Sequence, residues 1–85
     1  MVLSQHEAKR RSGEVSGVTN IAYDLMVVLA NKLEGIAAIE EYKLDADAAG
    51  SAEVRAVLER IESRDRQDVD ELRDHLITHL RRVQA

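Results

Sequence analysis

The amino-acid sequence predicts an all-α protein: a long antiparallel helical hairpin that pairs with a second copy of itself and so closes a four-helix bundle. Three observations favour this fold. Apolar residues recur at spacings of three and four along two long segments, as on the buried face of a helix. One break, around Gly50, separates the two segments. The 85-residue chain contains no proline, a residue that would interrupt long helices.

The chain divides into a leader, residues 1–17, and a hairpin, residues 18–85. The leader contains three consecutive basic residues, Lys9 to Arg11, and its two glycines interrupt any helix. We expect a mobile or short-helical arm. The alternative is an arm that docks on the acidic surface of a partner.

The first helix of the hairpin begins at Thr19 or Asn20, because either residue can cap a helix N-terminus. Its apolar residues cover a wide arc when they are placed at about 100° per residue. One flank of the arc carries Met26 and Leu33, and the other carries Ile21 and Val28. We therefore expect this helix to contact more than one neighbour. The apolar residues are Ile21, Leu25, Val28, Leu29, Leu33, Ile36, Ile39 and Leu44.

A short turn joins this helix to the second one. Gly50 suits the left-handed position that ends a helix, and Ser51 can cap the helix that follows. Each helix spans about 30 residues, or about 45 Å. Because two helices enclose no interior, we expect a homodimer or a multiple of it. The apolar residues of the second helix are Val54, Val57, Leu58, Ile61, Val69, Leu72, Leu76, Leu80 and Val83.

The composition excludes several classes of protein. A net charge of −4 and an aromatic content of 2% do not suit nucleic-acid binding. The absence of cysteine excludes thiolate metal sites and thiol catalysis. The longest strongly apolar run, Leu25 to Ala30, is far shorter than the roughly 20 residues of a membrane span. We find neither a signal peptide nor a catalytic motif, and we expect a cytoplasmic protein.

The candidate site lies where charged residues interrupt the apolar stripes. Asp65 and Asp68 interrupt the stripe of the second helix, and Lys32 interrupts that of the first. Counted outward from the turn, Lys32 comes level with Asp68 and Val69, so it can reach Asp68 and also Asp65 within one hairpin. Buried charges are costly unless they are paired or bind a metal, so this position has to be explained.

Three interpretations follow. Lys32 and Asp68 can form a structural ion pair that fixes the register of the helices. Alternatively, Asp65 and Asp68 of two chains can bind iron or another divalent metal, or the three side chains can simply be solvated. We favour the ion pair because a hard cation needs several oxygen ligands and Lys32 would repel it. Accordingly, Lys32→Ala should destabilise the protein more than Lys32→Met combined with Asp68→Leu.

Two further groups of polar residues are weaker candidates for a site. Glu40, Lys43 and Asp47 lie at the edge of the apolar arc near the turn, and we expect their side chains to reach water. His75 and His79 have the i, i+4 spacing of a transition-metal site. No carboxylate or cysteine is expected near them, so we interpret both histidines as residues at the edge of the helix contact.

A resemblance to a known family covers about Asn20 to Leu76. The segments that carry it are Tyr23-Asp24-Leu25, Val28-Leu29, Leu33-Glu34-Gly35, Glu41-Tyr42, Glu53-Val54-Arg55-Ala56-Val57-Leu58-Glu59 and Asp65-Arg66. In these segments the chain resembles small bacterial ferritin-like hairpin proteins. That group includes the half-length ferritins associated with encapsulin shells and a set of short ferritin-like domains of unclear role.

In the active members of that family, a glutamate on the first helix and a Glu-x-x-His pair on the second bind iron at a dimer interface. By position, the pair falls on Asp65 and Asp68, and the first-helix glutamate falls on Gly35. The resemblance therefore implies a ferritin-like module with a degenerate metal site and a role in structure or oligomerisation, and ferroxidase activity only if the metal site is intact.

Two alternatives to this function stay open. One is an iron- or divalent-metal-binding protein with Asp65 and Asp68 at the dimer interface. The other is a regulatory protein that binds a partner through the basic leader. An encapsulin shell is not the expected partner, because residues His79 to Ala85 include no apolar docking tail.

Overall fold

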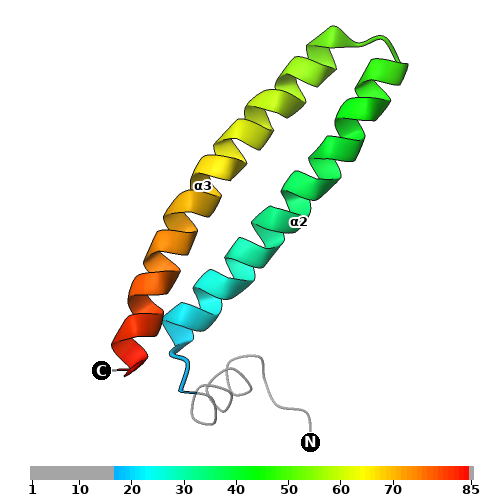
Figure 1. The fold of residues 1–85 in the computed structure, drawn as a ribbon. Helices are drawn as coiled ribbons and strands as arrows, with labels where there is room; N and C mark the ends of the chain where they lie inside the picture. The colour runs from blue at the N-terminus through cyan, green and yellow to red at the C-terminus, as the bar shows by residue number, and fades with distance from the viewer. Residues whose placement is uncertain (1–16, 85) are drawn as a thin grey trace, which may run out of the picture.

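The structure, a computed structural model, describes residues 17–84, with side chains as far as Arg81. Two helices, α2 (Asn20–Ala48) and α3 (Ala52–Gln84), run antiparallel and lie side by side (Figure 1). No strand occurs in this range, so the predicted all-α hairpin is confirmed. Except for Gly17, the predicted leader, with Lys9 to Arg11, lies outside the described residues.

The start of α2 is determined by a local hydrogen bond. Thr19 has an extended backbone conformation, and its side-chain oxygen accepts a hydrogen bond from the backbone N–H of Ala22 at 3.2 Å. One of the first N–H groups of the helix, which has no partner within the helix itself, is satisfied in this way. The predicted helix start is confirmed.

The turn between the helices is a Schellman motif centred on Gly50, whose φ of 70° lies in the left-handed region. Gly50 N–H donates to Asp47 O at 3.0 Å, and Ser51 N–H donates to Ala46 O at 2.9 Å. The Ser51 hydroxyl then accepts a hydrogen bond from Val54 N–H at 3.3 Å, which caps α3. Both roles predicted for Gly50 and Ser51 are therefore confirmed.

The two helices meet along a seam in which spacings of three and four residues alternate. This 3.5-residue period is that of a coiled coil, and it keeps one row of side chains against the partner helix. Every residue of the seam is buried or half-buried. The seam consists of Ala22, Leu25, Leu29, Lys32, Ile36, Ile39, Lys43 and Ala46 on α2 and of Arg55, Leu58, Glu62, Asp65, Val69, Leu72, Leu76 and His79 on α3.

The seam has a different set of residues on each side. We call one side the glycine face; its residues each precede a seam residue and are Ile21, Val28, Gly35, Tyr42, Val54, Ile61, Asp68 and His75. We call the other side the charged face; its residues each follow a seam residue and are Met26, Leu33, Glu40, Asp47, Glu59, Arg66, Arg73 and Leu80.

The core of the hairpin is thin. Within the described residues only Ala22, Ile36, Ile39 and Ala46 are buried, and no large side chain is fully buried. Many apolar residues of the two predicted stripes stay exposed, because two helices can cover only one row of side chains on each other. The exposed ones include Ile21, Val28, Leu33, Leu44, Val54, Val57 and Ile61.

Candidate functional site

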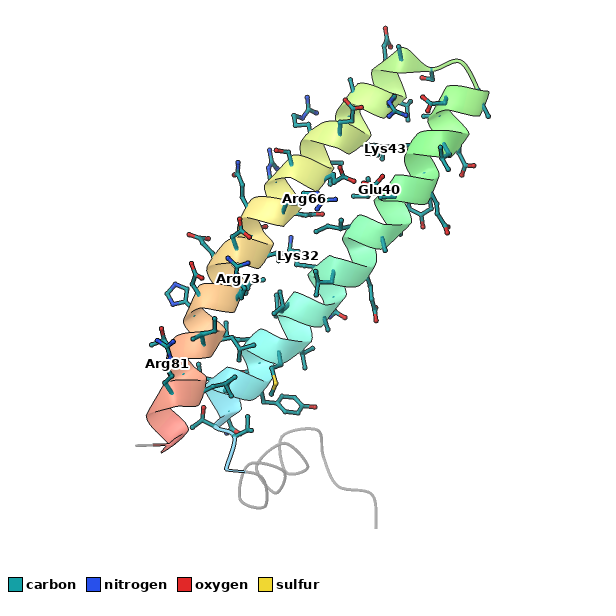
Figure 2. The ribbon with its side chains drawn as sticks, in the orientation of Figure 1. Lys32, Glu40, Lys43, Arg66, Arg73 and Arg81 are labelled. Atoms are coloured by element: carbon teal, nitrogen blue, oxygen red, sulfur yellow. The ribbon has the colours of Figure 1, made fainter. Side chains whose placement is uncertain are left out.

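The structure brings the three candidate residues together in the middle of the hairpin. Lys32 Nζ, on α2, lies 3.0 Å from Asp65 Oδ1 and 3.1 Å from Asp68 Oδ2, both on α3. Figure 2 shows Lys32 between the two helices. The Asp65 side chain is 16% exposed, whereas those of Lys32 and Asp68 are 33% and 42% exposed. Asp65, which lies in the seam, is therefore the more buried of the two acids.

These contacts hold Lys32 in its charged form. A hydrogen bond to Asp65 and a second one to Asp68 raise the pKa of Lys32 above its usual 10.5, although desolvation acts in the opposite direction. The site therefore combines one ammonium with two acidic side chains. A side-chain cation already lies at the point where the two acids converge.

The residues of one hairpin do not fit a metal centre. A divalent cation at Asp65 and Asp68 would have to displace Lys32 or lie beside its positive charge. Divalent iron or manganese also needs more protein donors than two carboxylates. In the range 17–84, no three His, Cys, Asp or Glu side chains gather closely enough to hold a metal ion. Gly35, on the first helix, offers no side-chain donor.

The two histidines occupy different positions. His79 lies half-buried in the seam near the open end of the hairpin, and His75 is exposed on the glycine face. His75 also lines a cavity of about 250 Å³ next to the Lys32 contacts. The complete lining of this cavity is Val28, Lys32, Asp68, Glu71, Leu72 and His75.

A second polar cluster, nearer the turn, is the feature that sequence reasoning missed. Lys43 Nζ lies 3.2 Å from Glu62 Oε1 on α3 and 3.3 Å from the carboxylate of Glu40 on its own helix. The side chains of Lys43 and Glu62 are each only 13% exposed. The expectation that Lys43 reaches water is therefore wrong, whereas Glu40 and Asp47 are about half exposed.

The position of these residues in the seam explains their burial. Lys43 follows Ile39 by four residues, and Glu62 follows Leu58 by four, so both continue the alternation that faces the partner helix. Their long aliphatic stems add apolar surface to the seam while their charged ends meet. The alternating spacing makes both residues candidates for the seam, but the wide apolar arc allows neighbouring rows of side chains as well.

Arg66 extends this second cluster onto the charged face. Its guanidinium lies 3.5 Å from Glu40 Oε1 and 3.8 Å from Glu62 Oε1 (Figure 2). The hydrogen bond with the Glu62 carboxyl group, followed by that from Lys43, lowers the pKa of Glu40 below its usual 4.5. Glu62 Oε2 is buried without a hydrogen-bond partner among the described residues. The Glu62 carboxyl group is therefore only partly satisfied.

Arg55 fastens the turn end of the seam. It pairs with Asp47 across the turn and with Glu59 on its own helix, where its Nε lies 3.0 Å from Glu59 Oε1. Its Nη1 also donates to the backbone carbonyl of Lys43 at 3.5 Å. Arg55 thus links both helices and the turn.

In both polar clusters, a lysine of the seam is held between carboxylates. Neither α2 nor α3 contains a stretch that is long and apolar enough to cross a membrane. Comparison of the chain with protein-family models, curated proteins and solved structures finds no match. The ferritin-like resemblance therefore stays a prediction.

Proposed function

We propose that this chain is a helical dimerisation module. Two hairpins pack into a four-helix bundle of the ferritin-like kind, and charged residues in each seam fix the register of the helices instead of holding a metal. The observation that carries the proposal is the position of the Lys32 ammonium between Asp65 and Asp68. In this site the positive charge is supplied by the chain itself.

Charged residues in a seam specify one alignment of the helices. An apolar seam would tolerate a slip of one heptad, because leucine packs against leucine in either register. Such a slip would separate Lys32 from Asp65 and Lys43 from Glu62, so that these charges lose their partners on the other helix. The two lysine contacts therefore discriminate against slipped hairpins, which suits a role in ordered assembly.

The thin core supports a second copy as the partner. A hairpin whose largest buried side chains are two isoleucines gains little from burial alone. Packing one hairpin on another would cover the exposed apolar residues and produce a closed bundle. We expect the full chain to sediment as a dimer, or a multiple of it, at micromolar concentration. A folded, monodisperse monomer at that concentration would reject the proposal.

The alternative function is divalent-metal binding by residues of two hairpins. One observation favours it: Asp68 is 42% exposed and lines the same cavity as Glu71 and His75. If two such cavities face each other in a dimer, they could supply more donors than one hairpin does. The regulatory role of the basic leader also stays a prediction, and it requires a pull-down that depends on Lys9, Arg10 and Arg11.

Thermal melting with and without Fe(II), Mn(II) or Zn(II) separates the first two functions. A metal that binds the folded protein at 100 times its Kd raises the stability by about 2.7 kcal/mol. If the chain is a metal-free dimerisation module, we expect none of the three metals to raise its stability. A rise that Asp65→Ala or Asp68→Ala abolishes would establish the metal site and reject the metal-free module.

A further inference from the structure

We propose that the glycine face is the surface on which the second hairpin docks, with Gly35 at the point of closest approach. This inference rests on the dimer of the proposed function and identifies the surface that forms it. The argument uses three observations: an unexplained glycine, the apolar residues around it, and the contrast with the charged face.

Gly35 is the first observation. It lies in the interior of α2, where its backbone is helical and requires no glycine. Glycine destabilises a helix interior relative to alanine, so its presence calls for a reason. A Cβ atom at this position would meet nothing within 4 Å. The hairpin therefore does not need the missing side chain, but a helix from outside could approach the backbone closely there.

The residues around Gly35 are the second observation. Val28, one heptad before it, is 44% exposed, and Tyr42, one heptad after it, is 52% exposed. On α3, Ile61 is 39% exposed and Val54 is 50% exposed. Among the residues that define this face, only Asp68 and His75 are polar. Asp68 already has a counter-ion in Lys32, so docking does not isolate its charge.

The charged face is the third observation. It includes Glu40, Asp47, Glu59, Arg66 and Arg73, so charged residues are in the majority on this side. Several of them form ion pairs within the hairpin, such as that between Arg66 and Glu40 at 3.5 Å. Burying these exposed pairs against a partner would remove their hydration, which is costly. Among the residues that define the glycine face, Asp68 forms such a pair with Lys32, so covering this face dehydrates fewer charges.

The size of the glycine face suits a second copy of the chain. A stable interface buries about 800 Å² on each partner. Two helices about 45 Å long and about 10 Å in diameter, lying side by side, present a face about 20 Å across, or roughly 900 Å². A two-fold axis would place one glycine face on another, so that apolar residues meet apolar residues and four helices close the bundle. A second hairpin is therefore the occupant that the area and the apolar character favour.

The first test compares two isoleucines of α3. Ile61 lies on the glycine face and is 39% exposed, whereas Ile77 lies outside it and is 40% exposed. We expect Ile61→Asp to raise the dimer Kd at least about 30-fold in sedimentation equilibrium, because it places a charge in an apolar interface. The matched Ile77→Asp should change the Kd by less than about threefold. Far-UV circular dichroism checks that both variants keep their helices.

The second test concerns Gly35. Gly35→Leu should raise the Kd at least about tenfold by holding the partner away, while the monomer gains a better helix-forming residue. Ala37→Leu, at an exposed position of the same helix outside the glycine face, is the control and should leave the Kd unchanged. Unchanged or tighter dimerisation of Gly35→Leu would overturn the assignment of closest approach to Gly35.

The outcomes for the dimer and for this surface are distinguishable. If the unmodified chain is a monomer at every concentration, the proposed function fails and the docking surface fails with it. If the unmodified chain is a dimer that Ile77→Asp dissociates and Ile61→Asp does not, the dimerisation module stands and the glycine face is the wrong surface.

Discussion

The two polar clusters of the seam show how differently similar ion pairs can be placed. In each, a lysine of α2 meets an acid of α3 at about 3 Å. Lys32 is 33% exposed and shares its charge between two aspartates, whereas Lys43 and Glu62 are each 13% exposed. One oxygen atom of Glu62 also has no hydrogen-bond partner within residues 17–84. The difference lies in access to water, and not in the number or length of the contacts.

Access to water decides what happens when one partner is removed. An exposed charge that loses its counter-ion is rehydrated, so the cost is small. A charge that stays shielded from water keeps its desolvation penalty and loses the interaction that offset it. The cluster that attracted less attention in the sequence, that of Lys43, is therefore the one on which folding should depend more.

The largest effect is expected for Lys43→Ala. Among the described residues, the substitution leaves the Glu62 carboxylate with Arg66, one turn along the same helix at 3.8 Å, as its nearby cation. We expect the Tm to fall by roughly 10 °C, the size typical of a strongly destabilising change in a small domain. Lys43→Met combined with Glu62→Leu should recover most of this loss, because both charges are then gone. A smaller loss for Lys43→Ala than for Lys32→Ala would reverse the comparison.

An intermediate effect is expected for Lys32→Ala, with a fall in Tm of roughly 5 °C. The structure also changes which acid should be replaced with it. Asp65 is 16% exposed and Asp68 is 42% exposed, so Lys32→Met with Asp65→Leu should restore more stability than Lys32→Met with Asp68→Leu. Equal Tm values for the single variant and both double variants would mean that water solvates this cluster fully.

The smallest effect is the pH dependence of the unmodified protein. The pKa of Glu40 is lowered, and the largest cause is the hydrogen bond with Glu62. The contribution of Glu40 to the free energy of unfolding is therefore present above pH 4.5 and is lost as the pH falls through the lowered pKa. The pKa values of Lys32 and Lys43 are raised. Their contributions are present below pH 10.5 and are lost as the pH rises through the raised values.

Chemical denaturation across the pH range measures this dependence. The free energy of unfolding attributable to these groups should be flat between about pH 5 and pH 10. It should fall outside both limits, and the alkaline fall should shrink in Lys43→Met combined with Glu62→Leu. For Lys43 the largest single effect is desolvation, which lowers the pKa, but the hydrogen bonds and the negative charges of Glu62 and Glu40 together raise it. An alkaline fall that the double variant leaves unchanged would assign the effect to other groups.

The hairpin itself was predictable because its signals are local. Thr19, Gly50 and Ser51 each satisfy backbone groups within a few residues of themselves, so their roles follow from the chain alone. Lys32, Asp65 and Asp68 could also be singled out, because a charge in an apolar stripe stands out against its neighbours. Their meeting followed from counting residues outward from a tight turn.

The sequence by itself determined two helices, the turn between them and the presence of charges in the seam. Only the tertiary structure decided which part of each wide apolar arc faces the other helix, and hence that Lys43 is shielded from water while Val28 and Ile61 stay exposed. A helix of 3.6 residues per turn offers several neighbouring rows of side chains. The orientation of the partner helix selects one of them, and no single helix carries that information in its own periodicity.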